Sequence, residues 1–161
     1  TAPRNMDISN LPQVPNRIPG EGGISTVRSM GTNINGEEVL LMDVGDMFQG
    51  TPIGNKTKGT AVVEYYNAIG YEFAVPGNHD FDMGRVNAER LAKLSEFPWI
   101  CANLYEDSTG TYVDWVQPTL MLEYQGIKIG VVGIITPGTA KMSFPKNIEG
   151  LQFRDMAELI L

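Results

Sequence analysis

Short apolar runs alternate with segments of helical periodicity along most of this chain, and this alternation constrains its fold more than any other feature. Three apolar runs have the length of buried strands, at residues 38–43, 73–75 and 99–102. Between them, residues 60–69 and about 84–95 repeat apolar side chains at helical spacing, and Gly70 follows the first segment where glycine ends many helices. The side chains expected to be buried on the second helix are Val86, Leu91 and Leu94. Strands alternating with helices predict an α/β fold.

The second half of the chain departs from this alternation. Residues 119–124 and 127–135 are strand-like runs separated by Gln125 and Gly126, a pair typical of a hairpin turn. The expected sheet is therefore mixed, with parallel and antiparallel strands. Residues 154–161 begin an apolar helical pattern, and we interpret their abrupt stop as a truncation inside a helix.

Composition limits the class of protein. A length of 161 residues with 42% apolar residues predicts one folded domain and excludes a disordered chain. No run approaches the roughly 18 apolar residues of a membrane span. The net charge of −7 disfavours a nucleic acid polymer as partner, so a bound phosphate needs positive charge from elsewhere.

The N-terminal residues and the single cysteine allow further predictions about the boundary of the domain and about the state of the thiol. Residues 1–23 hold prolines and glycines without an apolar period, which predicts a loop or arm. Residues 24–30 have the pattern of a helix end, so the domain is expected over 24–161. Cys101 lies between apolar neighbours in a predicted strand, which favours a packed thiol over a reactive one.

Polar or small residues follow the predicted strands at four places. These are Gly45-Asp46, Gly77-Asn78-His79-Asp80, Asn103 and Thr136-Pro137-Gly138. In open α/β sheets, ligands bind beyond the carboxyl ends of the strands, so the four segments are expected at one edge. Their oxygen and nitrogen donors suit Mg, Mn or Zn. Taken singly, each aspartate or asparagine is also a common turn residue, and a lone histidine is commonly structural.

Two of these segments carry a resemblance. The runs Gly45-Asp46-Met47-Phe48-Gln49-Gly50 and Gly77-Asn78-His79-Asp80-Phe81-Asp82 resemble the metal-binding core of the calcineurin-like metallophosphoesterases, in their 5′-nucleotidase branch. The segments 102–105 and 133–137 extend the resemblance, which covers about residues 20–161. It implies a layered α/β fold with a mixed sheet flanked by helices, incomplete in this chain.

The resemblance also implies a role for each site residue. Asp46 would bridge two divalent ions (Mn, Zn or Mg), and Asn78 would bind one of them through its amide oxygen. His79 would stabilise charge on the phosphoryl or leaving oxygen, with Asp82 orienting its ring as the second member of a catalytic dyad. Asp80 stands where this branch more often has Glu, and we interpret it as a local cap. Asn103 is the candidate substrate-binding residue.

The family's other motifs are not found in the sequence. Its D-x-H and G-H-x-H ligand segments have no counterpart, since His79 is the only histidine. We interpret these 161 residues as lying outside the family's substrate-binding C-terminal domain. The expected function is 5′-nucleotidase-type hydrolysis of a nucleotide or another small phosphate ester by an internal part of a larger enzyme that is inactive alone. The family's usual location is periplasmic, cell-surface or secreted. The alternatives are a non-catalytic remnant of the fold, a cyclic-nucleotide phosphodiesterase, a nucleotide pyrophosphatase or a thiosulfate-ester hydrolase.

Overall fold

The computed structural model describes residues 31–32, 38–124 and 126–159. The strands are β1 (Gly31–Thr32), β2 (Glu38–Val39), β3 (Met42–Asp43), β4 (Phe73–Ala74), β5 (Leu104–Glu106), β6 (Thr119–Tyr124), β7 (Ile127–Val132) and β8 (Leu151–Phe153). The α-helices are α1 (Pro52–Lys56), α2 (Thr60–Ile69), α3 (Arg85–Leu94) and α4 (Thr139–Met142). Short 3₁₀ turns cover Asn78–Phe81, Pro145–Asn147 and Met156–Leu159. The expected arm at 1–23 and helix end at 24–30 lie outside the described residues.

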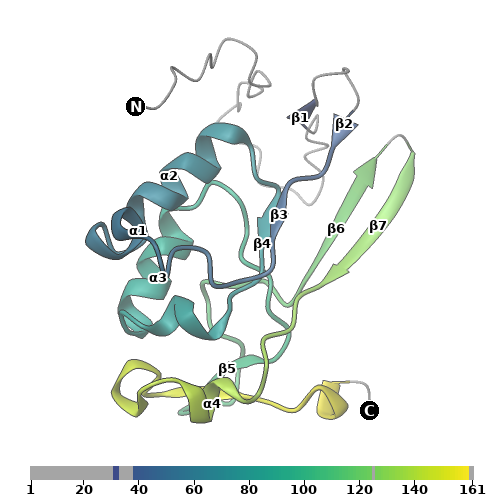
Figure 1. Cartoon of the computed structure of the whole chain (residues 1–161). Coiled ribbons are helices and arrows are strands. Elements are labelled where there is room, and N and C mark those ends of the chain that lie inside the picture. The colour runs from purple at the N-terminus through teal and green to yellow at the C-terminus, as the bar shows by residue number, and fades with distance from the viewer. Residues whose placement is uncertain (1–30, 33–37, 125, 160–161) are drawn as a thin grey trace.

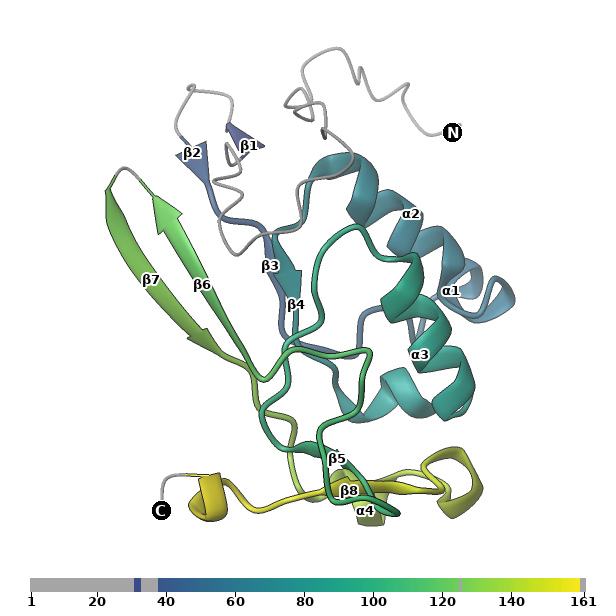
Figure 2. The same ribbon diagram turned by 180° about the vertical axis from the view of Figure 1, so that it is seen from behind.

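The elements form an α/β arrangement around a short parallel core. Helices α1 to α3 lie together on one side of β3 and β4, and the β6–β7 hairpin lies on the other side (Figures 1 and 2). Strands β5 and β8 pair antiparallel beside α4. The pair β3–β4 is parallel and the pair β6–β7 is antiparallel, so both predicted strand directions occur. The described strands form four separate two-stranded sheets, however, and not one mixed sheet.

The parallel pair β3–β4 places the two motif segments next to each other. Its register pairs Met42 with Phe73 and Asp43 with Ala74, and Trp99 makes a parallel bridge to Ala74. The predicted strand at 99–102 is reduced to isolated bridges. The reason is a change of partner, because the amide of Cys101 bonds the carbonyl of Gln117 and the next amide bonds that of Gly133.

Both long predicted helices are present, but the buried side of α3 differs from the prediction. Helix α2 ends at Gly70, whose positive φ of 81° lets its N–H bond the Tyr66 carbonyl. In α3 the buried residues are Asn87, Ala88 and Leu91, whereas Val86 is 79% exposed and Leu94 is 37% exposed. Asn87 is buried at little cost because its amide donates to the Lys58 carbonyl at 3.1 Å.

An aromatic core lies between the helices and the chain segments that follow β4. Trp99 and Trp115 meet edge to face at 6.2 Å, and Phe81 meets Phe153 edge to face at 5.5 Å. Cys101 is fully buried in this core, which confirms the predicted packed thiol. Since Phe81 ends the turn that carries His79, the core anchors the candidate site directly.

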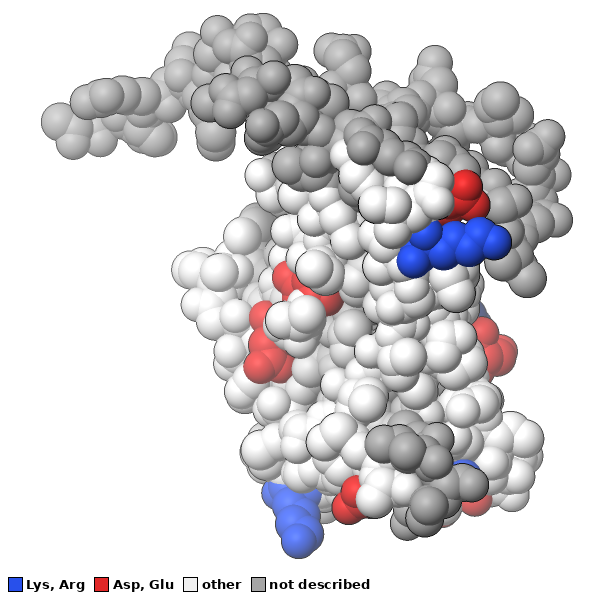
Figure 3. All heavy atoms as spheres, turned by 90° about the vertical axis from the view of Figure 1, so that its right-hand side faces the viewer, with Lys and Arg blue, Asp and Glu red and all other residues white. Residues whose placement is uncertain are grey.

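The outer face on the hairpin side carries few charged groups (Figure 3). Exposed apolar side chains of the hairpin include Met121, Ile127 and Val132, which are 56%, 63% and 60% exposed. The inner side of β6 packs Leu120 and Leu122 against a second small cluster. No helix of the described part of the chain is long and apolar enough to cross a bilayer.

Candidate metal and phosphoryl site

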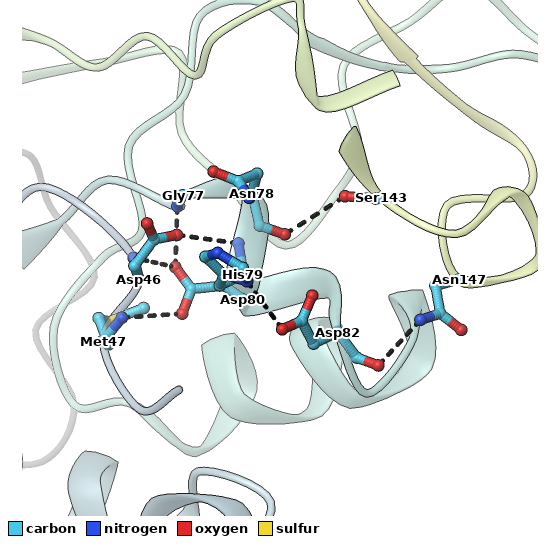
Figure 4. A network of polar contacts seen from close by, with 9 residues as sticks. All are labelled: Asp46, Met47, Gly77, Asn78, His79, Asp80, Asp82, Ser143 and Asn147. Atoms are coloured by element: carbon cyan, nitrogen blue, oxygen red, sulfur yellow. Dashed lines mark hydrogen bonds and ion pairs between the residues drawn. The ribbon is translucent and has the colours of Figure 1, made fainter. Parts of the chain in front are cut away.

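The loops that follow β3 and β4 meet at the carboxyl ends of the two strands, as expected for a parallel pair. The backbone N–H of His79 donates to Oδ1 of Asp46 at 2.8 Å, across 33 positions of sequence. Figure 4 shows Asp46, Asn78 and His79 gathered where the loops meet. The structure therefore brings together three of the residues singled out from the sequence.

Two glycines make this approach possible. Gly45 has φ +107°, and a Cβ built there would lie 2.5 Å from the backbone nitrogen of Gly77. A Cβ on Gly77 would in turn lie 2.3 Å from Oδ1 of Asp46. Any side chain at either position would push the loops apart. Steric crowding therefore explains why both motifs have glycine at these positions.

Asp46 presents its carboxylate from an unusual backbone conformation. Its φ is 62°, in the left-handed region that few residues other than glycine, Asn and Asp adopt. The residue is exposed, while the His79 N–H fixes one carboxylate oxygen. An exposed carboxylate held in one orientation is suited to binding a cation.

His79 and Asp82 form a side-chain pair at the end of the same turn. Nδ1 of His79 lies 2.8 Å from Oδ2 of Asp82, with side-chain exposures of 45% and 32%. A carboxylate only accepts hydrogen bonds, so Nδ1 carries the proton and Nε2 remains for another partner. Hydrogen bonding to Asp82 raises the pKa of His79 above its ordinary value, while desolvation opposes the change.

A second segment supports this turn from behind, and sequence reasoning missed it. Oγ of Ser143 donates to the Asn78 carbonyl at 3.4 Å, and Nδ2 of Asn147 donates to the Asp82 carbonyl at 2.8 Å. Both residues lie 65 positions from their partners, so nothing in local spacing could have identified them. The predicted segment 136–138 leads into α4 and hence into this support.

Asp80 is a buried acid that touches both loops. Its carboxylate accepts the N–H groups of Gly77 at 2.8 Å, Asp46 at 3.0 Å and Met47 at 3.0 Å. Burial raises the pKa of Asp80 to about 7, and the three N–H donors act in the opposite direction. A local cap accounts only for the Gly77 contact.

Asn103 does not have the geometry of a substrate ligand. It is fully buried, its amide donates to the carbonyls of Ile135 (2.7 Å) and Arg154 (3.0 Å), and its oxygen accepts from the Ile135 amide at 3.0 Å. Both the amide nitrogen and the amide oxygen of Asn103 are used in these hydrogen bonds, which join three chain segments. We therefore replace the predicted substrate contact with a structural role.

The donor set fits divalent metal in kind but not in number. A carboxylate oxygen from Asp46 and an amide oxygen from Asn78 are ligand types that Mg, Mn and Zn accept. Among the described residues, no group of three or more His, Cys, Asp or Glu side chains could hold an ion. The described residues can therefore supply part of a coordination sphere.

Comparison with known proteins gives related sequences and folds, although no family model matches the chain. The chain is 32% identical over 145 residues to the silent protein UshA(0) of Salmonella typhimurium, covering 86% of this chain and 26% of that protein. It is 34% identical over 123 residues to a 5′-nucleotidase of Vibrio cholerae, covering 76% and 22%.

Solved structures agree with these relatives. A 5′-nucleotidase precursor from Thermus thermophilus superposes with a TM-score of 0.66 at 28% identity, over 75% of this chain and 24% of that one. The calcineurin-like phosphoesterase YfkN from Bacillus subtilis gives 0.62 at 27% identity, over 74% and 41%.

The fold and the paired glycine loops place the protein in the class of calcineurin-like phosphoesterases. Within that class, the chain belongs to the 5′-nucleotidase family. It spans about a quarter of the length of the curated relatives that it matches.

Proposed function

We propose that this chain contributes to a di-metal phosphohydrolase site of the 5′-nucleotidase type, acting on the phosphate ester of a nucleotide. The observation that carries the proposal is the contact between the Asp46 carboxylate and the His79 N–H beside the His79–Asp82 pair. A carboxylate suited to binding a cation thus lies next to a histidine that can donate to an anionic oxygen.

Each residue has a separate task in the proposed reaction. Asp46 and Asn78 would hold metal through their oxygens, and the chemistry that bound divalent ions would supply there is neutralisation of phosphate charge and activation of water. His79 directs Nε2 at the phosphoryl or leaving oxygen and donates a proton to it or stabilises its charge. Asp82 keeps the proton on Nδ1 and the ring in orientation.

The proposed substrate and location rest on the family alone. A nucleotide or another small phosphate ester needs cationic help at this site, because the chain has a net charge of −7. The proposed location, which is periplasmic, cell-surface or secreted, is inferred from the chain's resemblance to the family. Choice between a nucleoside monophosphate, a cyclic nucleotide, a dinucleotide and a thiosulfate ester depends on contacts outside the residues described.

A non-catalytic remnant of the fold is the second candidate. The observation in its favour is the small donor set, since Asp46 and Asn78 cannot by themselves hold two ions against water and the sequence has one histidine. The two candidates differ in whether the site works once other ligands are supplied.

A chimera separates the two candidates. Residues 38–159 would replace the matching segment of the Vibrio cholerae 5′-nucleotidase, which would supply the remaining ligands. We expect Mn²⁺-dependent hydrolysis of AMP, abolished by Asp46→Asn and lowered roughly 10²- to 10³-fold in kcat by His79→Asn with bound metal unchanged. A folded chimera that binds two ions without turnover would support the remnant instead.

A further inference from the structure

The Asp80 carboxylate connects segments that are far apart in sequence. Two of its three hydrogen bonds reach the amides of Asp46 and Met47, which lie 34 and 33 positions away. The third reaches Gly77 in its own turn. Dashed lines in Figure 4 show the carboxylate between the two loops.

The Asp46 loop holds an unfavourable backbone conformation, which contacts with the surrounding structure must stabilise. Asp46 has a positive φ of 62° and Gly45 one of 107°, so the backbone turns sharply where it approaches Gly77. A strained backbone persists only where the surroundings determine it. Asp80 meets that need, because its carboxyl oxygens accept hydrogen bonds from three N–H groups and are shielded from water.

We propose that Asp80 is a positioning residue whose carboxylate clamps the Asp46 loop onto the turn of Asn78 and His79, so that the site is arranged before an ion or substrate arrives. Its importance for catalysis rests on the proposed function, but the hydrogen bonds that form the clamp do not depend on that function. A free Asp46 loop would lose the left-handed conformation that presents its carboxylate. The clamp therefore lowers the reorganisation that metal binding would otherwise require.

Amide hydrogen exchange in the ¹⁵N-labelled 161-residue chain measures the clamp without any metal. The amides of Asp46, Met47 and Gly77 report on it, and those of Ile100 and Cys101, which are bonded within the core, report on global opening. In Asp80→Ala, we expect the three clamp amides to exchange about tenfold faster or more, relative to the two core amides.

Asp80→Asn gives a more specific signature. One carboxylate oxygen accepts from both Gly77 and Asp46, while the other accepts from Met47 alone. The Asn oxygen keeps the two-donor position, and its NH₂ group then faces the Met47 N–H. Exchange should therefore accelerate at Met47 and stay close to the original rate at Gly77 and Asp46, a pattern that general destabilisation would not produce.

The control is Asp155→Asn, which removes a carboxylate that caps the amide of Ala157. We expect it to leave all three clamp amides unchanged. The proposal is overturned if Asp80→Ala accelerates Gly77 alone, or if Met47 is unaffected in Asp80→Asn. The Asn variant decides the matter if the Ala variant does not fold.

A titration of the same samples with Mn²⁺ tests metal binding separately from the clamp. Broadening at Asp46 and Asn78 in the original chain supports the metal site, and weaker broadening in Asp80→Asn supports prearrangement. If the original chain shows no broadening but the amides respond as expected, the clamp stands, and the proposed function fails only if the chimera, which supplies the remaining ligands, also binds no metal.

Discussion

At the scale of single residues, the charge state of His79 depends most on its neighbour Asp82. Asp82 hydrogen-bonds Nδ1 and raises the pKa of the ring, while Asp46 and Asp80 add smaller contributions of the same sign. A ring that stays protonated to higher pH can donate to an anionic oxygen over a wider range. The His79 side chain is 45% exposed, which leaves room for an anionic oxygen as its partner.

The effect of Asp82 on His79 can be measured directly, because the sequence contains one histidine. Asp82→Asn keeps a hydrogen-bond acceptor and removes the charge, so the pKa of His79 should fall toward the ordinary value of about 6.5. A proton NMR titration of the single ring signal measures it. Asp155→Asn is the control and should leave the titration unchanged; an unaltered pKa in Asp82→Asn would contradict the pairing.

The same pair sets a pH dependence of stability. The folded-state pKa of His79 lies above its unfolded value, so the pairing stabilises the fold below about pH 6.5 and is lost as pH rises through the raised pKa. The partial exposure of both side chains keeps this contribution small.

Gly77→Ala tests the close approach of the loops. The added methyl would lie 2.3 Å from Oδ1 and 2.6 Å from the nitrogen of Asp46, and we expect a loss of about 1 to 3 kcal/mol in unfolding free energy. Gly130→Ala is the matched control, because its nearest atom would be a flexible Met121 methyl at 3.8 Å. Denaturant unfolding of both variants gives the comparison, and equal stabilities would show that the loops have room to separate.

At the scale of elements, Asn103 joins the segment after Trp99 to the chain at Ile135 and Arg154. Asn103→Ala would leave the buried amide of Ile135 without its partner, at a cost of about 1 to 3 kcal/mol for each unsatisfied group. Asn67→Ala, which removes exposed bonds to the end of α3, should cost less than about 1 kcal/mol. Similar losses in thermal or denaturant unfolding would contradict the structural role assigned to Asn103.

The elements predicted from sequence differ in accuracy for physical reasons. Helix α2 and the β6–β7 hairpin were predictable because each is defined by local periodicity and a local turn residue. The segment 99–102 was not, because its hydrogen bonds alternate between Gln117 and Gly133. The buried face of α3 was misjudged because the polar Asn87 is satisfied by the distant Lys58 carbonyl.

The site shows the same division. Asp46, Asn78, His79 and Asp82 could be proposed as site residues because the family motifs are contiguous in sequence. The clamp by Asp80 and the support from Ser143 and Asn147 depend on contacts across 33 to 65 positions, which one sequence does not reveal. The role of Asn103 was misread for a related reason, since its position after a strand says nothing of its burial.

At the scale of the whole molecule, the described part of the chain presents a pre-formed pair of loops with few metal donors. We expect the whole chain to show no appreciable turnover of AMP or a chromogenic phosphate ester with Mn²⁺, Zn²⁺ or Mg²⁺. Steady-state assays of the purified chain measure this. Turnover in the usual enzyme range of about 1 to 10³ per second would show that the described donors suffice.

The central claim is that Asp46 and Asn78 bind metal and that His79 does not. The most direct measurement is a Mn²⁺ titration of the ¹⁵N-labelled chain, comparing the original protein with Asp46→Asn and His79→Asn by the broadening of amide signals around both loops. We predict broadening centred on Asp46 and Asn78 that persists in His79→Asn and is lost in Asp46→Asn. Broadening that survives in Asp46→Asn, or disappears in His79→Asn, would contradict the assignment.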